Sequence, residues 1–233
     1  MLPSGPMQDI EGNVEAVRKR IRAAAMGAGR DPAEVELLAV SKTRPVPQLL
    51  EAIGTGLTAL GESRVQEAET KIPQVRESVR WHLIGKLQTN KARLAATLFD
   101  GIHSVDRTAL VDRLGVAASN GGRQIDVYVQ VEFSRTEQSE QTIHSHAAEL
   151  CRQVDAAPGL QLAGLMTLPP FGPTPESARP YFQRLARLRA QITGETGLRL
   201  PGLSMGMTND FEVAIEEGAT IVRVGTAIFG PRI

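Results

Sequence analysis

The sequence predicts a single-domain α/β fold, a (β/α)₈ barrel of the TIM type with one additional helix at its N-terminus. Short apolar runs of strand length alternate with helical patterns along the whole chain, and eight such runs can be counted. Strands that alternate with helices form right-handed parallel crossover units, and eight of these units close into a barrel. The length of 233 residues agrees with such a barrel as one domain. A doubly wound open sheet with the same alternation is the alternative architecture.

The first predicted element is an amphipathic helix, which ends at two glycines, Gly27 and Gly29. The segment before it is rich in proline. We therefore expect residues 1–6 to be a disordered extension and residues 7–233 to form the barrel domain. The apolar positions that define the helix recur at helical spacing: Ile10, Val14, Val17, Ile21 and Ala25.

The strands and helices that follow are predicted from the period of their apolar residues. No shift of composition along them marks a second domain. The predicted strands span residues 35–40, 59–61, 81–85, 101–105, 127–133, 162–166, 202–205 and 221–225. The predicted helices between them span residues 47–53, 65–72, 90–98, 108–118, 143–154 and 180–192.

Composition excludes several classes of protein. The 26 basic and 26 acidic residues cancel, which argues against binding to nucleic acid or to a membrane through charge. No secretory signal and no apolar run of about 18 residues is present. The single cysteine cannot form an internal disulfide, so we expect a cytoplasmic protein. The common nucleotide-binding and hydrolase motifs are also missing.

Lys42 directly follows the first strand, at the end of the strands where barrels build their active sites. The chain has five lysines in all, and this one lies next to the apolar run 35–40. An amine that apolar neighbours partly desolvate has a lowered pKa and is a stronger nucleophile. Lys42 is therefore a candidate Schiff-base lysine. The alternative is an ordinary solvated lysine at a strand end.

Two polar segments with glycines follow the last two strands. Residues 204–208 read Ser-Met-Gly-Met-Thr, and Gly225 precedes Thr226. The loops after strands seven and eight of a barrel often bind phosphate through backbone N–H groups, so we expect an anion site between these segments. The alternative is that the glycines only permit tight turns.

Arg223 alternates with Val222 and Val224 along the last strand, so its side chain faces the side opposite to theirs. A charge inside the mouth of a barrel needs a partner, which is a carboxylate, a phosphate or a pyridine nitrogen. A structural Arg–Glu pair inside the barrel is the alternative to a ligand contact.

The histidines and the cysteine do not indicate a metal site. His144 and His146 have no cysteine or carboxylate set to complete a zinc site, so we expect no zinc enzyme. His82 and His103 lie in or near strand ends, where each either lines a pocket or is a hydrogen-bonded core histidine. Cys151 falls on an apolar helical face and is expected to be packed rather than reactive.

Five segments distributed over most of the chain carry a family resemblance. They read LLAVSKT at 37–43, WHLIGKLQTNK at 81–91, GLMT at 164–167, LSMGMTNDF at 203–211 and VRVGTAIFG at 222–230. In order and spacing they resemble the pyridoxal phosphate homeostasis proteins (YggS-type), which are related to the barrel domain of alanine racemase. The resemblance implies a (β/α)₈ barrel that binds one pyridoxal 5′-phosphate (PLP).

The resemblance also implies roles for single residues. Lys42 would carry PLP as an internal aldimine, and Arg223 would face the pyridine nitrogen. The family usually has asparagine where Ser63 stands, so a side-chain contact near the cofactor is altered here. Ser204, Gly225 and Thr226 would hold the phosphate, and the other cofactor-binding positions would be Ser63, His82, Met166 and Met207.

These roles favour a carrier over an enzyme. A guanidinium beside the ring nitrogen favours its unprotonated form by about one to three pKa units, which weakens PLP as an electron sink. The alanine racemase relatives take a second acid/base residue from another domain, for which this chain, ending at Ile233, leaves no room. We therefore expect a monomer that stores, buffers or delivers PLP to apo-enzymes without strong turnover.

Two enzymatic alternatives stay open from the sequence. The first is a small PLP-dependent amino-acid racemase or lyase, in which Lys42 transfers a proton on one ring face and His82 or His103 on the other. The second is a Schiff-base aldolase that uses the lysine without a cofactor, since such aldolases also have barrel folds.

Overall fold

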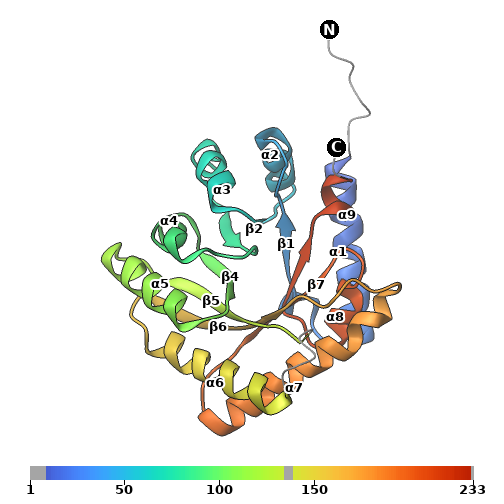
Figure 1. Ribbon diagram of the computed structural model, residues 1–233. Helices are drawn as coiled ribbons and strands as arrows, with labels where there is room; N and C mark the ends of the chain where they lie inside the picture. The colour runs from blue at the N-terminus through green and yellow to red at the C-terminus, as the bar shows by residue number, and fades with distance from the viewer. Residues whose placement is uncertain (1–8, 134–138, 232–233) are drawn as a thin grey trace.

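Parallel strands in the described part of the chain form a closed barrel in which each strand pairs with the next and the last pairs with the first (Figure 1). This computed structural model describes residues 9–133 and 139–231. The expected extension at residues 1–6 lies outside the described residues. The barrel confirms the predicted fold and excludes the open sheet. The strands are β1 (Glu36–Val40), β2 (Ala59–Glu62), β3 (Arg80–Leu83), β4 (Gly101–Val105), β5 (Ile125–Val131), β6 (Leu160–Thr167), β7 (Gly202–Met207) and β8 (Ile221–Val224).

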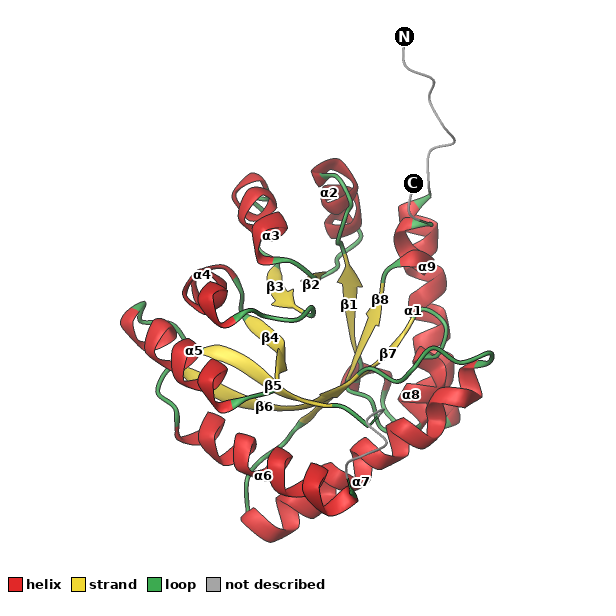
Figure 2. Ribbon diagram, viewed as in Figure 1, coloured by secondary structure: helices red, strands yellow, loops and turns green. Residues whose placement is uncertain are grey.

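Helices surround the strands on the outside of the barrel (Figure 2). Each predicted helix is present within a few residues of its expected bounds. The two short helices after β7 and β8 were not predicted. The helices are α1 (Ile10–Gly27), α2 (Val46–Gly54), α3 (Val65–Lys71), α4 (Ala92–Leu98), α5 (Thr108–Asn120), α6 (Glu140–Ala156), α7 (Arg179–Thr196), α8 (Phe211–Glu216) and α9 (Thr226–Phe229).

The N-terminal helix α1 packs beside the C-terminal elements α8 and α9 (Figure 1). Asp9 caps its first turn by accepting a hydrogen bond from the Gly12 N–H at 2.8 Å, which satisfies one of the amides that a helix start leaves free. The Asn13 side-chain amide donates to the Ile228 carbonyl at 2.9 Å. These contacts join the two ends of the described chain. The predicted apolar positions of α1 are all buried.

The strands bury apolar residues on both faces, as expected for a parallel sheet covered by helices. Val222 and Val224 belong to the large apolar layer between the barrel and the helices. The barrel interior holds a second, smaller cluster, made of Leu38, Ala59, Tyr128, Ala163, Met166 and Ile221. Successive strand residues point to opposite faces, so Arg223 shares the interior with this second cluster.

The strand β7 extends to Met207, two residues beyond its predicted end. Gly206, expected in the loop after this strand, lies within the strand, with φ +90°. A Cβ at this glycine would lie 2.6 Å from the Cβ of Ala214 in α8. The glycine therefore allows a helix to approach the strand closely.

No helix in the two described ranges is long and apolar enough to cross a membrane.

Candidate functional site

Lys42 lies at the carboxyl end of β1, as predicted, in a turn that the Arg44 N–H closes by donating to the Ser41 carbonyl at 3.0 Å. Its side chain is half-buried at the rim of the barrel. The next residue, Thr43, has a φ of +65°, a left-handed conformation that costs a β-branched residue about 1–2 kcal/mol. Backbone strain of this kind persists where the surrounding structure fixes it, often at functional sites.

The ends of β7 and β8 meet beside this turn. The Gly225 N–H points to the Thr208 hydroxyl, with the nitrogen and oxygen 3.4 Å apart. An ideal Cβ at Gly225 would lie 3.2 Å from the Cβ of Val40, so the β8 end touches the strand that carries Lys42. The helix α9 starts directly after Gly225 with the exposed Thr226, and the first amides of a helix have no partner within it. A hydroxyl and backbone amides thus gather next to the Lys42 turn.

Arg223 is buried inside the barrel below this rim, with 3% of its surface exposed. Its Nη1 donates to the Ser204 hydroxyl at 2.7 Å and its Nη2 donates to the Thr167 carbonyl at 3.0 Å. Burial lowers the pKa of the guanidinium to about 10, and the charge of Asp210 opposes this shift. Arg223 therefore stays cationic at neutral pH. Within residues 9–133 and 139–231 it forms no ion pair with a carboxylate, so the expected alternative of a structural Arg–Glu pair is not found.

Two histidines continue the hydrogen bonds of Arg223 across the barrel. The Ser204 hydroxyl accepts from Arg223, so its proton is free to be donated to Nδ1 of His103, 2.7 Å away. That assigns the His103 proton to Nε2, which donates to Nδ1 of His82 at 2.9 Å. The proton of His82 then lies on Nε2, which is buried and has no partner among the described residues.

The hydrogen bonds from Ser204 through His103 to His82 require both histidines to be neutral. Burial lowers the pKa of His82 to about 3, and the charge of Arg80 adds to the shift. The pKa of His103 is well below its ordinary value because of burial, with contributions from His82 and Arg223. The ring of Tyr128 packs against His103 with centroids 4.4 Å apart. Arg223 is thus the charged end of a series of hydrogen bonds whose other side chains are neutral.

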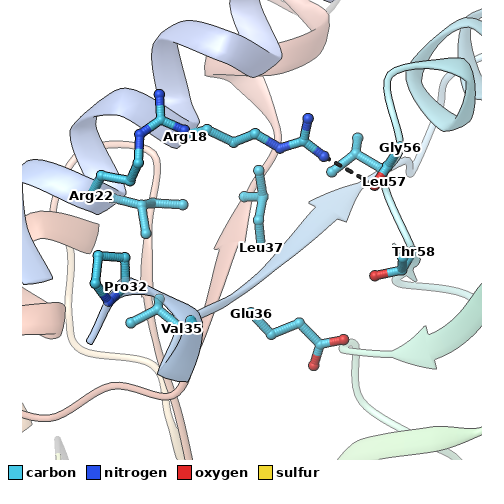
Figure 3. Close-up of a pocket in the computed structure, with 11 residues that line it drawn as sticks. Arg18, Arg22, Pro32, Val35, Glu36, Leu37, Gly56, Leu57 and Thr58 are labelled. Carbon is cyan, nitrogen blue, oxygen red and sulfur yellow. Dashed lines mark hydrogen bonds between the residues drawn. The ribbon is translucent and has the colours of Figure 1, made fainter. Parts of the chain in front are cut away.

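A cavity of about 360 Å³ lies elsewhere, beside the amino end of β1 between α1 and the turn before β2 (Figure 3). Glu36 and Thr58 contribute to its wall. Arg18 reaches across from α1 and donates to the carbonyls of Thr55 and Gly56 at 2.8 Å and 3.0 Å. Its guanidinium therefore fixes α1 to this turn. The cavity is at the end of β1 opposite to Lys42 and is separate from the candidate site.

Comparison with known proteins identifies the family. The family model described as the alanine racemase N-terminal domain matches residues 12–232. The pyridoxal phosphate homeostasis protein of Pseudomonas aeruginosa is 42% identical over 227 residues, covering 97% of each chain. That of Vibrio alginolyticus is 39% identical over 231 residues, covering 97% of this chain and 99% of the relative. The chain belongs to the pyridoxal phosphate homeostasis protein family.

A solved structure supports the same assignment. PipY of Synechococcus elongatus PCC7942, determined with PLP bound, is 35% identical and superposes with a TM-score of 0.83. The match covers 95% of this chain and 100% of PipY. The present chain thus shares its fold with PipY, a relative whose structure contains PLP.

The positions implied by family resemblance divide into two groups in this family member. Lys42, Ser63, Met207, Gly225 and Thr226 lie at the carboxyl ends of strands, partly or fully accessible. The remaining four are in the closed interior, each at most 3% exposed: His82, Met166, Ser204 and Arg223.

The expectation that Ser204 belongs to the loop after strand seven is wrong. Ser204 lies inside β7, pairs with Ile221 of β8, and has no exposed surface. Its hydroxyl is held by Arg223 and His103. Thr208, which follows the strand and contacts Gly225, lies at the rim instead.

Cys151 is fully buried, which confirms that it is packed, and burial raises the pKa of its thiol to about 12.

Sequence reasoning missed two further features of this site. Thr208 lies in the segment 204–208, and the early predicted end of the strand hides its place at the rim. Lys71 is the second feature. Its spacing of four residues from Glu67 on a helix, just after the strand-end Glu62, is the pattern from which an ion-pair cluster could be predicted.

Proposed function

We propose that this protein binds PLP at the rim around Lys42 and serves cytoplasmic PLP homeostasis by storing, buffering or delivering the cofactor. The observation that carries the proposal is the position of Lys42 in the turn after β1, the strand next to β8. The ends of β7 and β8 present a hydroxyl and backbone amides beside that strand. An aldehyde with an anionic tail fits this arrangement of one amine and an anion-binding turn.

The residues present agree with that ligand in chemistry. The Lys42 amine would hold the aldehyde carbon covalently, with release of water. Thr208 and the amides of Gly225 and Thr226 would bind the phosphate. A guanidinium has five N–H donors, and the hydrogen bonds of Arg223 to Ser204 and Thr167 use two of them. Further donors of Arg223 would face the ring nitrogen.

The same residues support storage rather than turnover. Bound PLP supplies an electron sink for chemistry at the α-carbon of amino acids, most strongly when its ring nitrogen is protonated. The buried Arg223 cation opposes that protonation. A racemase or lyase needs a second acid/base group, whereas His82 and His103 are hydrogen-bonded to each other and burial lowers the pKa of both.

Reduction with borohydride tests the proposal directly. The wild-type protein is incubated with PLP and reduced. Its intact mass is measured by mass spectrometry, and the protein is then digested to map the adduct. We expect a visible absorption band before reduction and one adduct on Lys42. Lys42→Ala should lose the band, whereas Lys19→Ala, which changes an exposed lysine of α1, should keep it. A colourless wild-type protein, or an adduct confined to another lysine, contradicts the proposal.

Two further measurements separate carrier from enzyme. Deuterium exchange at the α-carbon of amino acids should not exceed that of free PLP if the protein is a carrier. Trapping with a sugar phosphate in place of PLP would indicate an aldolase.

Mixing the loaded protein with an apo-enzyme tests delivery through recovery of that enzyme's activity. Light scattering tests the proposed monomer.

A further inference from the structure

Lys71, the last residue of α3, is buried next to the Lys42 turn, with 8% of its surface exposed. Its ammonium makes three hydrogen bonds. They go to the Ser41 carbonyl at 2.9 Å, to Oε1 of Glu62 at 2.9 Å and to Oε1 of Glu67 at 2.5 Å. An ammonium has three donors, so every one is used. Such a complete set fixes the position of the lysine and of the groups it binds.

Glu67 connects this ammonium to the other side of Lys42. The same carboxylate oxygen that binds Lys71 accepts the backbone N–H of Thr43 at 2.5 Å. The hydrogen bond offsets part of the cost of the left-handed conformation of Thr43. Burial opposes ionisation of Glu67, but the hydrogen bonds from Lys71 and Thr43 outweigh it and lower the pKa of the carboxyl.

Glu62 fixes the residue before Lys42. It lies at the end of β2 with no exposed surface, and its Oε1 accepts from the Ser41 hydroxyl at 2.7 Å as well as from Lys71. The Ser41 N–H donates to the Gly61 carbonyl at 2.9 Å. Ser41 is thus held by backbone and side chain to the neighbouring strand.

The cluster of Glu62, Glu67 and Lys71 therefore holds both peptide groups that flank the α-carbon of Lys42. One is bound through the Ser41 carbonyl and the other through the Thr43 N–H. A residue whose two peptide groups are fixed has a fixed direction from Cα to Cβ. The side chain of Lys42 then starts from one orientation, and less rotational freedom is lost when its amine is held by a ligand.

We propose that Lys71, acting through Glu67 and Glu62, is a positioning residue for the Lys42 amine. The inference rests on the proposed function, since it concerns the amine that would hold PLP. It adds a second lysine to the site, one that does not touch the cofactor. A lysine suits this position because one ammonium pairs with both carboxylates while it donates to a backbone carbonyl.

The test compares PLP binding in Lys71→Met, Glu67→Ala and the matched control Lys19→Met, which changes an exposed lysine of α1 in the same way. We expect Lys71→Met and Glu67→Ala to weaken PLP binding at least tenfold and to reduce the visible circular dichroism per bound PLP. That signal reports the orientation of the bound chromophore. The control should match the wild type in both measurements.

A second comparison uses the strain at Thr43. Glycine adopts positive φ readily, so Thr43→Gly should make the turn less dependent on Glu67. The loss of affinity caused by Glu67→Ala should be at least threefold smaller in the Thr43→Gly background. This coupling is measured as a double-mutant cycle and does not require the Lys71 variant to fold.

The outcomes are distinct. If the variants melt at lower temperature but bind PLP with wild-type affinity and dichroism below that temperature, the cluster is only structural and the inference is wrong. An unchanged effect of Glu67→Ala in the Thr43→Gly background also contradicts it. If the wild-type protein itself forms no adduct on Lys42, the proposed function fails instead.

Discussion

The hydroxyl of Ser204 lies 2.7 Å from Nη1 of Arg223 in the closed interior of the barrel. It also lies 2.7 Å from Nδ1 of His103, so one hydroxyl accepts from a cation and donates to a neutral imidazole. A buried cation is costly unless it is hydrogen-bonded, and here the interior supplies a hydroxyl and a carbonyl instead of a carboxylate. Arg223 therefore keeps its positive charge unneutralised by any direct ion pair within the described ranges.

Ser204→Ala should destabilise the protein by about 2–4 kcal/mol, because it removes an acceptor from a buried charge and a donor from His103. Unfolding in urea measures the change. The control Thr97→Ala removes an exposed hydroxyl that bonds within its own helix, to the Leu94 carbonyl at 2.8 Å, and should cost about 0.5 kcal/mol or less. Equal changes in the free energy of unfolding would show that the buried hydroxyl of Ser204 contributes no more to stability than an exposed one.

Stability should fall with acidification through the ordinary range of histidine. Burial lowers the pKa of His82 from 6.5 to about 3. Between these values the unfolded chain binds a proton at this residue and the folded protein does not. The stability from neutral His82 is complete above about pH 6.5 and is lost as pH falls toward 3. The slope is at most about 1.4 kcal/mol per pH unit for one histidine.

The prediction is checked by urea unfolding of wild type and His82→Gln between pH 7 and pH 4.5. The free energy of unfolding of the variant should depend less on pH than that of the wild type. The carboxylates that also titrate are common to both proteins and do not contribute to the difference. Thr97→Ala, a change at an exposed residue that does not titrate, should leave the dependence as it is. Parallel curves for wild type and His82→Gln would mean that His82 does not resist protonation in the folded protein.

Thr208, rather than Ser204, should contact the phosphate of PLP, because Thr208 lies at the rim beside Gly225. We expect Thr208→Val to weaken PLP binding about tenfold or more, the range for a lost hydrogen bond to a charged group. Binding of pyridoxal, which lacks the phosphate, should change little. Thr193→Val, on the exposed face of α7, is the control. A similar loss for pyridoxal and PLP would place Thr208 away from the phosphate.

The barrel was predictable because its signals are local. Strand-length apolar runs and amphipathic helices are read from neighbouring residues, and the position of Lys42 after β1 follows from them directly. Alternation with Val222 and Val224 places Arg223 on the strand face opposite to theirs, and the structure shows that this face is the barrel interior.

Other features depend on contacts between distant segments. The end of strand seven is predicted at residue 205, two residues too early, because Gly206 resembles a turn residue, and only the pairing of Met207 with Arg223 shows that the strand continues through the glycine. The hydrogen bonds from Arg223 to His82 join four strands. The cluster around Lys71 joins the ends of β1 and β2 to α3. No local sequence pattern specifies these contacts, since they depend on how the barrel closes.

The contact between β6 and β7 yields a final prediction, about two glycines. Gly164 follows an irregularity in the pairing of β5 with β6 and has a φ of +149°, where an L side chain is strained. A Cβ there would lie 1.9 Å from the carbonyl oxygen of Gly202, which is backbone and cannot turn aside. Gly164→Ala should therefore cost about 3 kcal/mol or more in the free energy of unfolding.

Gly194 provides the matched substitution. It lies in α7 with nothing within 4 Å of its ideal Cβ, so Gly194→Ala adds the same methyl group in open space. Alanine is a better helix former, and the protein should gain about 0.5–1 kcal/mol. Urea unfolding of both variants should thus give changes of opposite sign. If Gly164→Ala unfolds like the wild type, strands β6 and β7 do not approach each other as closely as this structure has them.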